Sequence, residues 1–128
     1  MSEPLNQGQE NAVQHWRSRV ESAIRAVSVS DACAQSVCNF LCEGIPPGSF
    51  VRAVLSNNLI AAVRCADKGN QALLSLFVNA LMMELTGQCW GSEKIVDEWI
   101  AKGGLRGWYR AENEDAERCE RAYEGALP

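Results

Sequence analysis

The sequence predicts an all-α fold, a compact single-domain bundle of five to seven helices. Apolar residues recur at steps of three and four along most of the chain, as they do on one face of a helix. Strand-like alternation is confined to residues 27–30, which is too short to justify a sheet. A chain of 128 residues that is 47% hydrophobic can bury one core without crosslinks or metals. We therefore expect a flexible segment at residues 1–9, a helical domain at 10–125 and a tail at 126–128.

The domain is predicted to begin with a helical hairpin. Between Glu10 and Val27 the apolar residues are spaced by three or four positions, while arginines and Glu21 occupy the other faces. Asp31 is expected to cap a second amphipathic helix through its side-chain oxygen, and this helix should run to Gly44, because a glycine in the left-handed conformation can end a helix there. We expect these two helices to pack on each other.

A rigid elbow follows at residues 45–48. Pro46 and Pro47 lack an amide donor and restrict the residues before them, so no helix continues through this point. Ser49 is a suitable N-cap for a short helix, and Asn57 or Asn58 can either end that helix or start the next one. The sequence leaves open whether residues 49–66 form one bent helix or two.

Three further helices are predicted in the second half of the chain. Apolar residues cover most of the helical circumference between Leu73 and Leu85, so we expect a central helix that is buried on several sides. Ser92 caps the next helix, which ends at the Gly103–Gly104 pair, and a charged, mostly solvated helix spans residues 113–124. The predicted core contains Trp16, Val20, Phe40, Phe77, Leu81 and Trp99.

The charge balance argues against nucleic acid as a direct partner. The chain has 12 basic and 16 acidic residues and a pI of about 5.0, so its surface should repel a polyphosphate. Its start lacks the basic and apolar stretches of a secretory signal. The apolar run at residues 72–83 is shorter than the ~20 residues that a membrane-spanning helix needs. We expect a cytoplasmic protein with no membrane association.

Neither the cysteines nor the single histidine forms a recognisable catalytic or metal site. In a reducing compartment the six cysteines should remain thiols. Cys33, Cys38 and Cys42 lack the paired Cys-x-x-Cys spacing of a zinc site, and the sequence places no orienting partner beside His15. Glu84, at the end of the predicted central helix, is expected to point outward. We expect no metal, no cofactor and no enzymatic activity.

The best candidate for a partner-binding segment is the last predicted helix and the residues before it. Residues 110–124 contain six acidic residues and three arginines, a local net charge of −3 out of the formal −4. An aromatic pair precedes this segment in an expected loop, and such side chains often anchor interfaces. An acidic helix beside exposed aromatics suits docking on a basic, nucleic-acid-handling protein. The predicted partner-binding residues are Trp108, Tyr109, Glu112, Glu114, Asp115 and Glu117.

The elbow suggests a second class of function, a small-ligand binder or sponge. The helix start at Ser49 offers backbone amides, and Arg52 and Arg64 could add positive charge for a phosphorylated or nucleotide messenger. Nearly every capped helix offers such amides, so this pattern discriminates less well than the acidic segment does.

Residues 45–50, 53–59 and 61–67, with Asn70, Cys89–Ser92 and Trp99, resemble a recurring small open reading frame of bacteriophages, prophages and other mobile elements. The resemblance covers roughly residues 40–105, about half of the chain. It implies a genomic context and no particular chemistry. Small phage accessory proteins of this kind often act stoichiometrically, so the resemblance implies a non-catalytic protein that binds and modulates a host protein in the bacterial cytoplasm. An inhibitor of a CRISPR-type defence is one such case.

Overall fold

The computed structural model describes residues 4–27 and 30–126, which form eight helices and no strands. The helices are α1 (Gln7–Arg25), α2 (Asp31–Glu43), α3 (Ser49–Leu55), α4 (Leu59–Cys65), α5 (Lys68–Ala72), α6 (Leu74–Glu84), α7 (Glu93–Lys102) and α8 (Gly104–Ala126). The all-α prediction is confirmed, although the predicted count of five to seven is too low. Residues 28–29 of the strand-like stretch, residues 1–3 and residues 127–128 of the expected tail lie outside the described part.

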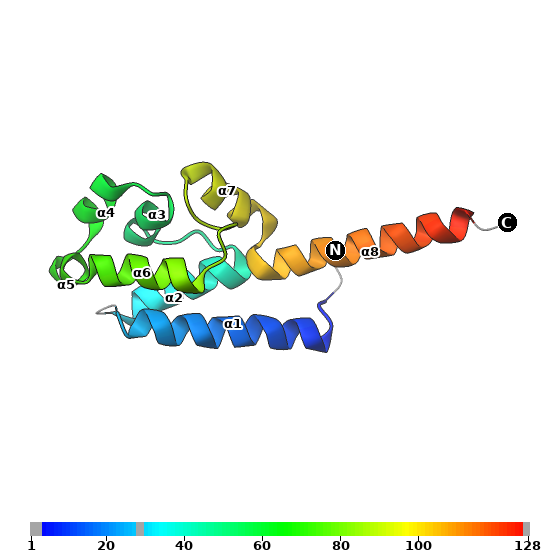
Figure 1. Cartoon of the computed structure of the whole chain (residues 1–128), viewed down its shortest axis with the longest axis horizontal. Coiled ribbons are helices and arrows are strands. Elements are labelled where there is room, and N and C mark those ends of the chain that lie inside the picture. Colours follow the sequence, from blue (N-terminus) through cyan, green and yellow to red (C-terminus); the bar gives the residue numbers. More distant parts are fainter. Residues whose placement is uncertain (1–3, 28–29, 127–128) are drawn as a thin grey trace.

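The hairpin of α1 and α2 forms the base of the fold (Figure 1). The Asn6 side chain accepts a hydrogen bond from the Gln9 backbone N–H at 2.8 Å, and the Gln9 side chain accepts one from the Asn6 N–H at 3.2 Å. This reciprocal capping starts α1 at Gln7, three residues before the expected domain boundary, and Leu5 is buried ahead of it. At the other end of the hairpin, α2 stops at Gly44, whose φ is 69°.

Residues 49–66 form two helices, α3 and α4. Ser56, Asn57 and Asn58 separate them, and Asn57 adopts a left-handed φ of 61°. Asn58 then caps α4 by accepting a hydrogen bond from the Ala61 N–H at 3.0 Å. The N-cap of α3 is Gly48, so the expected capping role of Ser49 is wrong.

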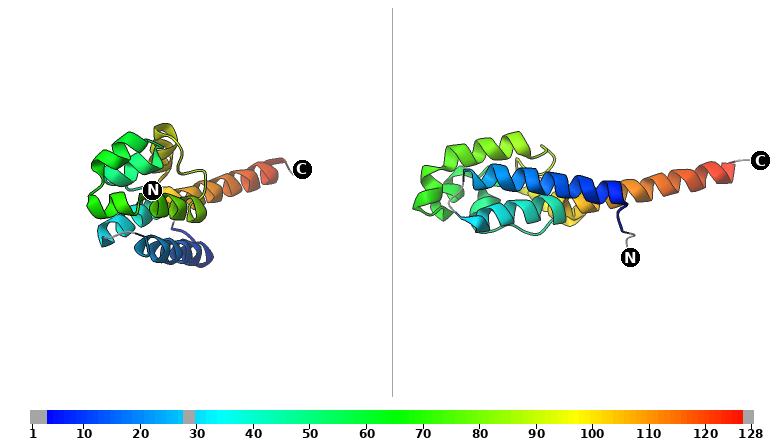
Figure 2. Two further views of the ribbon diagram at one scale, coloured as in Figure 1. Left: turned by 60° about the vertical axis from the view of Figure 1, so that its left-hand side comes forward. Right: turned by 90° about the horizontal axis from the view of Figure 1, so that it is seen from below.

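The predicted central position of α6 is also wrong. Its buried residues are Phe77 and Leu81, whereas Leu76, Met82 and Met83 are more than half exposed. The helix packs against α1 on the outside of the bundle (Figure 2). The apolar pattern identified the side chains of α6 that can be buried. It could not show how many other helices pack against α6.

The corner between α7 and α8 is tighter than expected. α7 ends at Gly103 with φ of 92°, and α8 begins at the next residue, Gly104, so Trp108 and Tyr109 are helical and not in a loop. A Cβ at Gly104 would lie 2.5 Å from the Gly44 nitrogen, so the two backbones touch here and only glycine fits. This contact fixes the start of α8 against the end of α2.

The core lies between the hairpin and the helices above it. Five of the six predicted core residues are buried, and Trp16 is partly buried at the edge. The Trp99 indole N–H donates to the carbonyl oxygens of Phe40 at 3.1 Å and Leu41 at 3.2 Å, so this ring ties α7 to α2. No helix of the described residues is long and apolar enough to cross a membrane.

Candidate functional site

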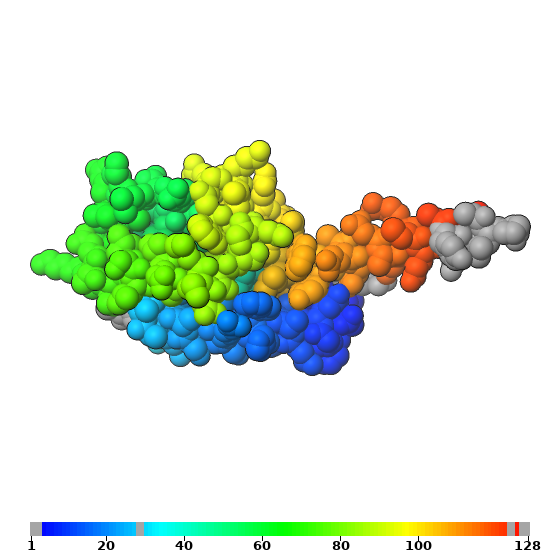
Figure 3. Space-filling view, viewed as in Figure 1, coloured from blue at the N-terminus to red at the C-terminus, as the bar shows by residue number. Residues whose placement is uncertain are grey.

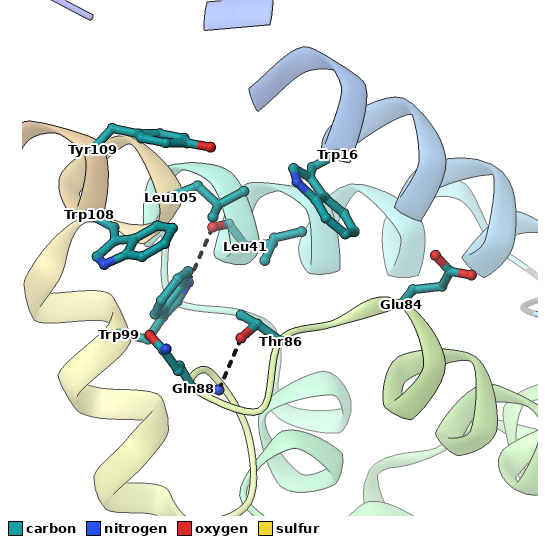
Figure 4. A pocket seen from close by; sticks show the side chains of 9 residues that line it. All are labelled: Trp16, Leu41, Glu84, Thr86, Gln88, Trp99, Leu105, Trp108 and Tyr109. Carbon is teal, nitrogen blue, oxygen red and sulfur yellow. Dashed lines mark hydrogen bonds between the residues drawn. The ribbon is translucent and has the colours of Figure 1, made fainter. Parts of the chain in front are cut away.

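A small aromatic pocket lies at the root of α8. Its volume is about 120 Å³, and it is lined by residues of α1, α2, the end of α6 and the connection after it, α7 and α8. Trp16 stands on one side and Trp108 and Tyr109 on the other, with Leu41 and Leu105 between them (Figure 4). The Trp108 and Tyr109 ring centroids are 5.6 Å apart. A pocket of this size and lining fits a single apolar side chain of a binding partner.

Glu84, Thr86 and Gln88 give the pocket a polar edge (Figure 4). A Glu84 Oε2 atom accepts a hydrogen bond from Arg19 Nε at 2.7 Å, and the same guanidinium lies 5.4 Å from the Trp16 ring centroid. The Glu84 side chain is 20% exposed, so it is paired at the pocket edge and does not point freely outward as expected. Its negative charge is therefore balanced within the chain.

Arg106 sets the position of α8 beneath this pocket. Its Nη1 donates to Glu10 of α1 at 2.6 Å, and its Nε donates to Glu43 of α2 at 2.8 Å. The hydrogen bonds to Glu10 and then Glu43 raise the pKa of the Arg106 guanidinium above its ordinary value. Because three helices meet at this side chain, α8 leaves the body in one defined direction.

A second tie joins α1 to α8 further along. Gln9 and Asn113 exchange two side-chain hydrogen bonds, at 2.8 and 3.0 Å. Sequence reasoning missed this pair and Arg106, because the partners are 104 and 96 positions apart along the chain and no local spacing marks them.

Beyond Asn113, α8 projects away from the body (Figure 3). Every residue from Glu114 to Ala122 is exposed. The ion pair that Asp115 makes with Arg118, at 3.5 Å, lies within this helix and is solvated. The acidic side chains therefore face solvent and remain available to a partner.

The predicted acidic residues do not share one face of α8. Glu114 and Glu117 are three positions apart and lie on one side, whereas Asp115 points elsewhere. Glu112 follows Trp108 by four positions, so it lies on the pocket side of the helix. The structure brings Trp108 and Tyr109 together in the pocket and arranges the four carboxylates around the helix that leaves it.

No family model, curated protein or solved structure matches this chain. Its own geometry therefore carries the functional argument. The pocket and the projecting helix are adjacent, because Trp108 and Tyr109 lie in α8 ahead of its exposed residues 114–122.

The alternative anion site is not assembled in the way the sequence suggested. Arg52 donates to Asp97 at 2.6 Å and lies 3.6 Å from Glu93, both on α7. The hydrogen bond to Asp97, with a smaller contribution from Glu93, raises the pKa of Arg52. The guanidinium therefore keeps its positive charge, and these two carboxylates balance it. Ser49 and Arg64 are exposed on α3 and α4. The arginine best placed at the elbow thus serves a structural ion pair.

The cysteines do not form a chemical centre. Cys38 and Cys42 lie one turn apart in α2, both buried, and burial raises the pKa of Cys38 to about 11. Burial also raises the pKa of Cys89 to about 12. Within the described residues, no group of three or more histidine, cysteine or acidic side chains could hold a metal ion. His15 is exposed on α1 with its ring against Trp16.

Proposed function

We propose that this chain is a non-catalytic binding protein that captures a partner protein with its aromatic pocket and the projecting part of α8. The observation that carries this proposal is the exposure of every residue from Glu114 to Ala122. Short helices without tertiary contacts are marginally stable in water, and burial of one face normally supplies the rest of their stability. A bound partner would supply that contact.

The two parts of the site would do different work. The acidic residues Glu112, Glu114, Asp115 and Glu117 would attract a basic surface and speed its association. The pocket between Trp16 and the Trp108–Tyr109 pair would hold one apolar side chain and slow dissociation. The partner should therefore present basic residues next to an apolar anchor.

A phage-type accessory role is the context that we propose for this activity. The support is the resemblance of residues 40–105 to mobile-element reading frames, together with an acidic helix that suits proteins whose basic surfaces handle nucleic acid. The partner would be a host protein in the bacterial cytoplasm. Inhibition of a CRISPR-type defence complex or of another nucleic-acid-handling complex fits this chemistry.

The test is capture of partners from a bacterial host lysate by the immobilised protein. The variant reverses three charges, Glu114→Lys, Asp115→Lys and Glu117→Lys. A matched control changes the net charge equally at exposed sites away from α8, with Asp31→Lys, Glu93→Lys and Glu98→Lys. We expect the α8 variant to retain much less of the partner and to lose the salt dependence of binding, while the control binds as the wild type does. Equal retention by both variants would refute the role of the acidic helix.

A further inference from the structure

Exposed apolar side chains gather on α4, at the end of the molecule away from α8, and on α6, which runs from that end toward the middle of the molecule (Figure 1). Seven large apolar side chains of the described residues are exposed, and six of them belong to these two helices. Their exposed fractions range from 41% to 73%. The six residues of the α4–α6 face are Leu59, Ile60, Val63, Leu76, Met82 and Met83.

A groove runs along this face between α6 and the α3–α4 pair. Three hollows of about 120, 200 and 550 Å³ adjoin one another in it and share residues such as Leu59, Val78 and Met82. No charged residue lines any of the three hollows. The groove is therefore shaped for apolar contact and offers nothing to an ionic ligand.

The size of the face suits an interface between proteins. Six large side chains with these exposed fractions present on the order of 500 Å² of apolar surface, near the upper end of what a monomer tolerates. A standard interface buries ~800 Å² per partner, so the polar rim of the groove, such as Ser75 and Asn79, would also have to take part in the contact.

The distribution of charge indicates which partner fits. In a two-fold dimer, residues near the axis meet their own copies, so a charge there would be repelled by itself. From Leu74 to Met83, α6 has no ionisable residue, whereas α1, α7 and α8 all carry charges along their exposed faces. Of the helix faces that the structure describes, this one alone combines a large apolar area with a charge-free axis.

We propose that two copies of this chain associate through their α4–α6 faces, with the two-fold axis passing near α6. Leu76, Asn79 and Met83 follow one another at i, i+3 and i+7 and form an exposed ridge beside the groove. The ridge of each copy packs in the groove of the other. Arg64 is exposed and follows Ile60 by one helical turn, so it borders the apolar face on α4 and does not line the groove. The acidic α8 of each copy then remains free, so the dimer would present two partner-binding helices.

Sedimentation velocity of the full chain from about 1 to 200 µM tests the proposal. We expect a species of twice the 14.0-kDa chain mass that persists at high salt, because the interface is apolar. Leu59 and Met82 line the groove and are 69% and 55% exposed, so Leu59→Glu and Met82→Glu should each weaken dimerisation at least about ten-fold by placing a charge in the interface. Ile45→Glu is the matched control, because Ile45 is 48% exposed but does not line the groove. Circular dichroism of each variant checks the fold, which substitutions at exposed positions should preserve.

A wild-type chain that stays monomeric throughout this range would overturn the proposal and leave the face to a different protein. The proposal would also be overturned if both glutamate variants still dimerise as the wild type does. Dissociation of the dimer by the charge reversal in α8 would overturn it as well.

Discussion

At the residue scale, Arg106 is the side chain on which the direction of α8 depends most. Its side chain is 18% exposed and holds a carboxylate from each helix of the hairpin. These two ion pairs stabilise the fold by less than their Coulomb energy suggests, because the charged groups lose water on burial. Removing the arginine alone is costly, however, because Glu10 and Glu43 would face each other without a cation.

We predict that Arg106→Ala lowers the free energy of unfolding by about 2 kcal/mol in urea denaturation. The matched control is Arg118→Ala, which removes an exposed arginine and should change stability by less than ~0.5 kcal/mol. If both variants unfold at the same urea concentration, Arg106 does not clamp the three helices.

The buried thiols give a second prediction at this scale. Burial raises the pKa of Cys38 from 9.0 to about 11 and that of Cys89 to about 12, so the folded state holds these protons more tightly than the unfolded chain does. Their contribution to stability is complete below pH 9 and is lost as the pH rises toward the folded-state values. We expect the midpoint of urea denaturation to fall between pH 9 and pH 11, and Cys38→Ala with Cys89→Ala to flatten that decline.

The same burial predicts which cysteines react. Cys65 and Cys119 are exposed, and the other four are buried. At pH 8 a thiol reagent should modify the two exposed cysteines of the native protein quickly and reach all six only after denaturation. Rapid modification of all six in the native protein would contradict the packing of α2.

At the element scale, the sequence located the ends of a helix well where a capping residue next to the helix sets them. Gly44, Ser92 and Gly103 act on their own neighbours, so the end of α2 and both bounds of α7 followed from the sequence. The expected capping role of Asp31 is wrong, because Ser30 caps α2 by accepting a hydrogen bond from the Cys33 N–H at 3.4 Å. The start of α8 did not, because a glycine pair can make either a loop or a corner. Contact between Gly104 and the end of α2 decides this, and that contact is tertiary.

The candidate site was predictable to a similar degree. Trp108, Tyr109 and the acidic residues stood out by composition alone. Trp16 and Gln88, which complete the pocket, come from distant parts of the chain, and no spacing rule connects them to Trp108. The wrong placement of α6 has the same origin, since amphipathic pattern does not report the number of packed neighbours.

The α2–α8 contact yields a prediction at this scale. Gly104→Ala would force a side chain into a backbone with φ of 68° and into contact with Gly44 and Cys42. We expect a loss of at least about 2 kcal/mol of unfolding free energy, measured in urea. Gly87→Ala is the control, because a Cβ there meets nothing within 4 Å, and it should be close to neutral. Equal stability of the two variants would mean that the corner is not as tight as the structure has it.

At the scale of the whole molecule, two surfaces of different chemistry lie toward opposite ends (Figure 1). The α4–α6 face is apolar and uncharged, while the projecting α8 is acidic. The proposed functions of these surfaces are separable, because salt weakens contacts of the acidic helix and barely affects an apolar interface. A protein that joins to its own copy at one end would keep the other end available for a different protein.

Amide hydrogen exchange of α8 tests the central claim, that the projecting helix is where a partner docks. In the free chain, residues 114–122 should exchange much faster than the buried α2, because no other part of the described chain covers them. In the complex captured from the host lysate, we expect these residues to become protected while α3 and α5 stay unchanged. Unaltered exchange of residues 114–122 in the complex would contradict the account, because the partner would then bind elsewhere.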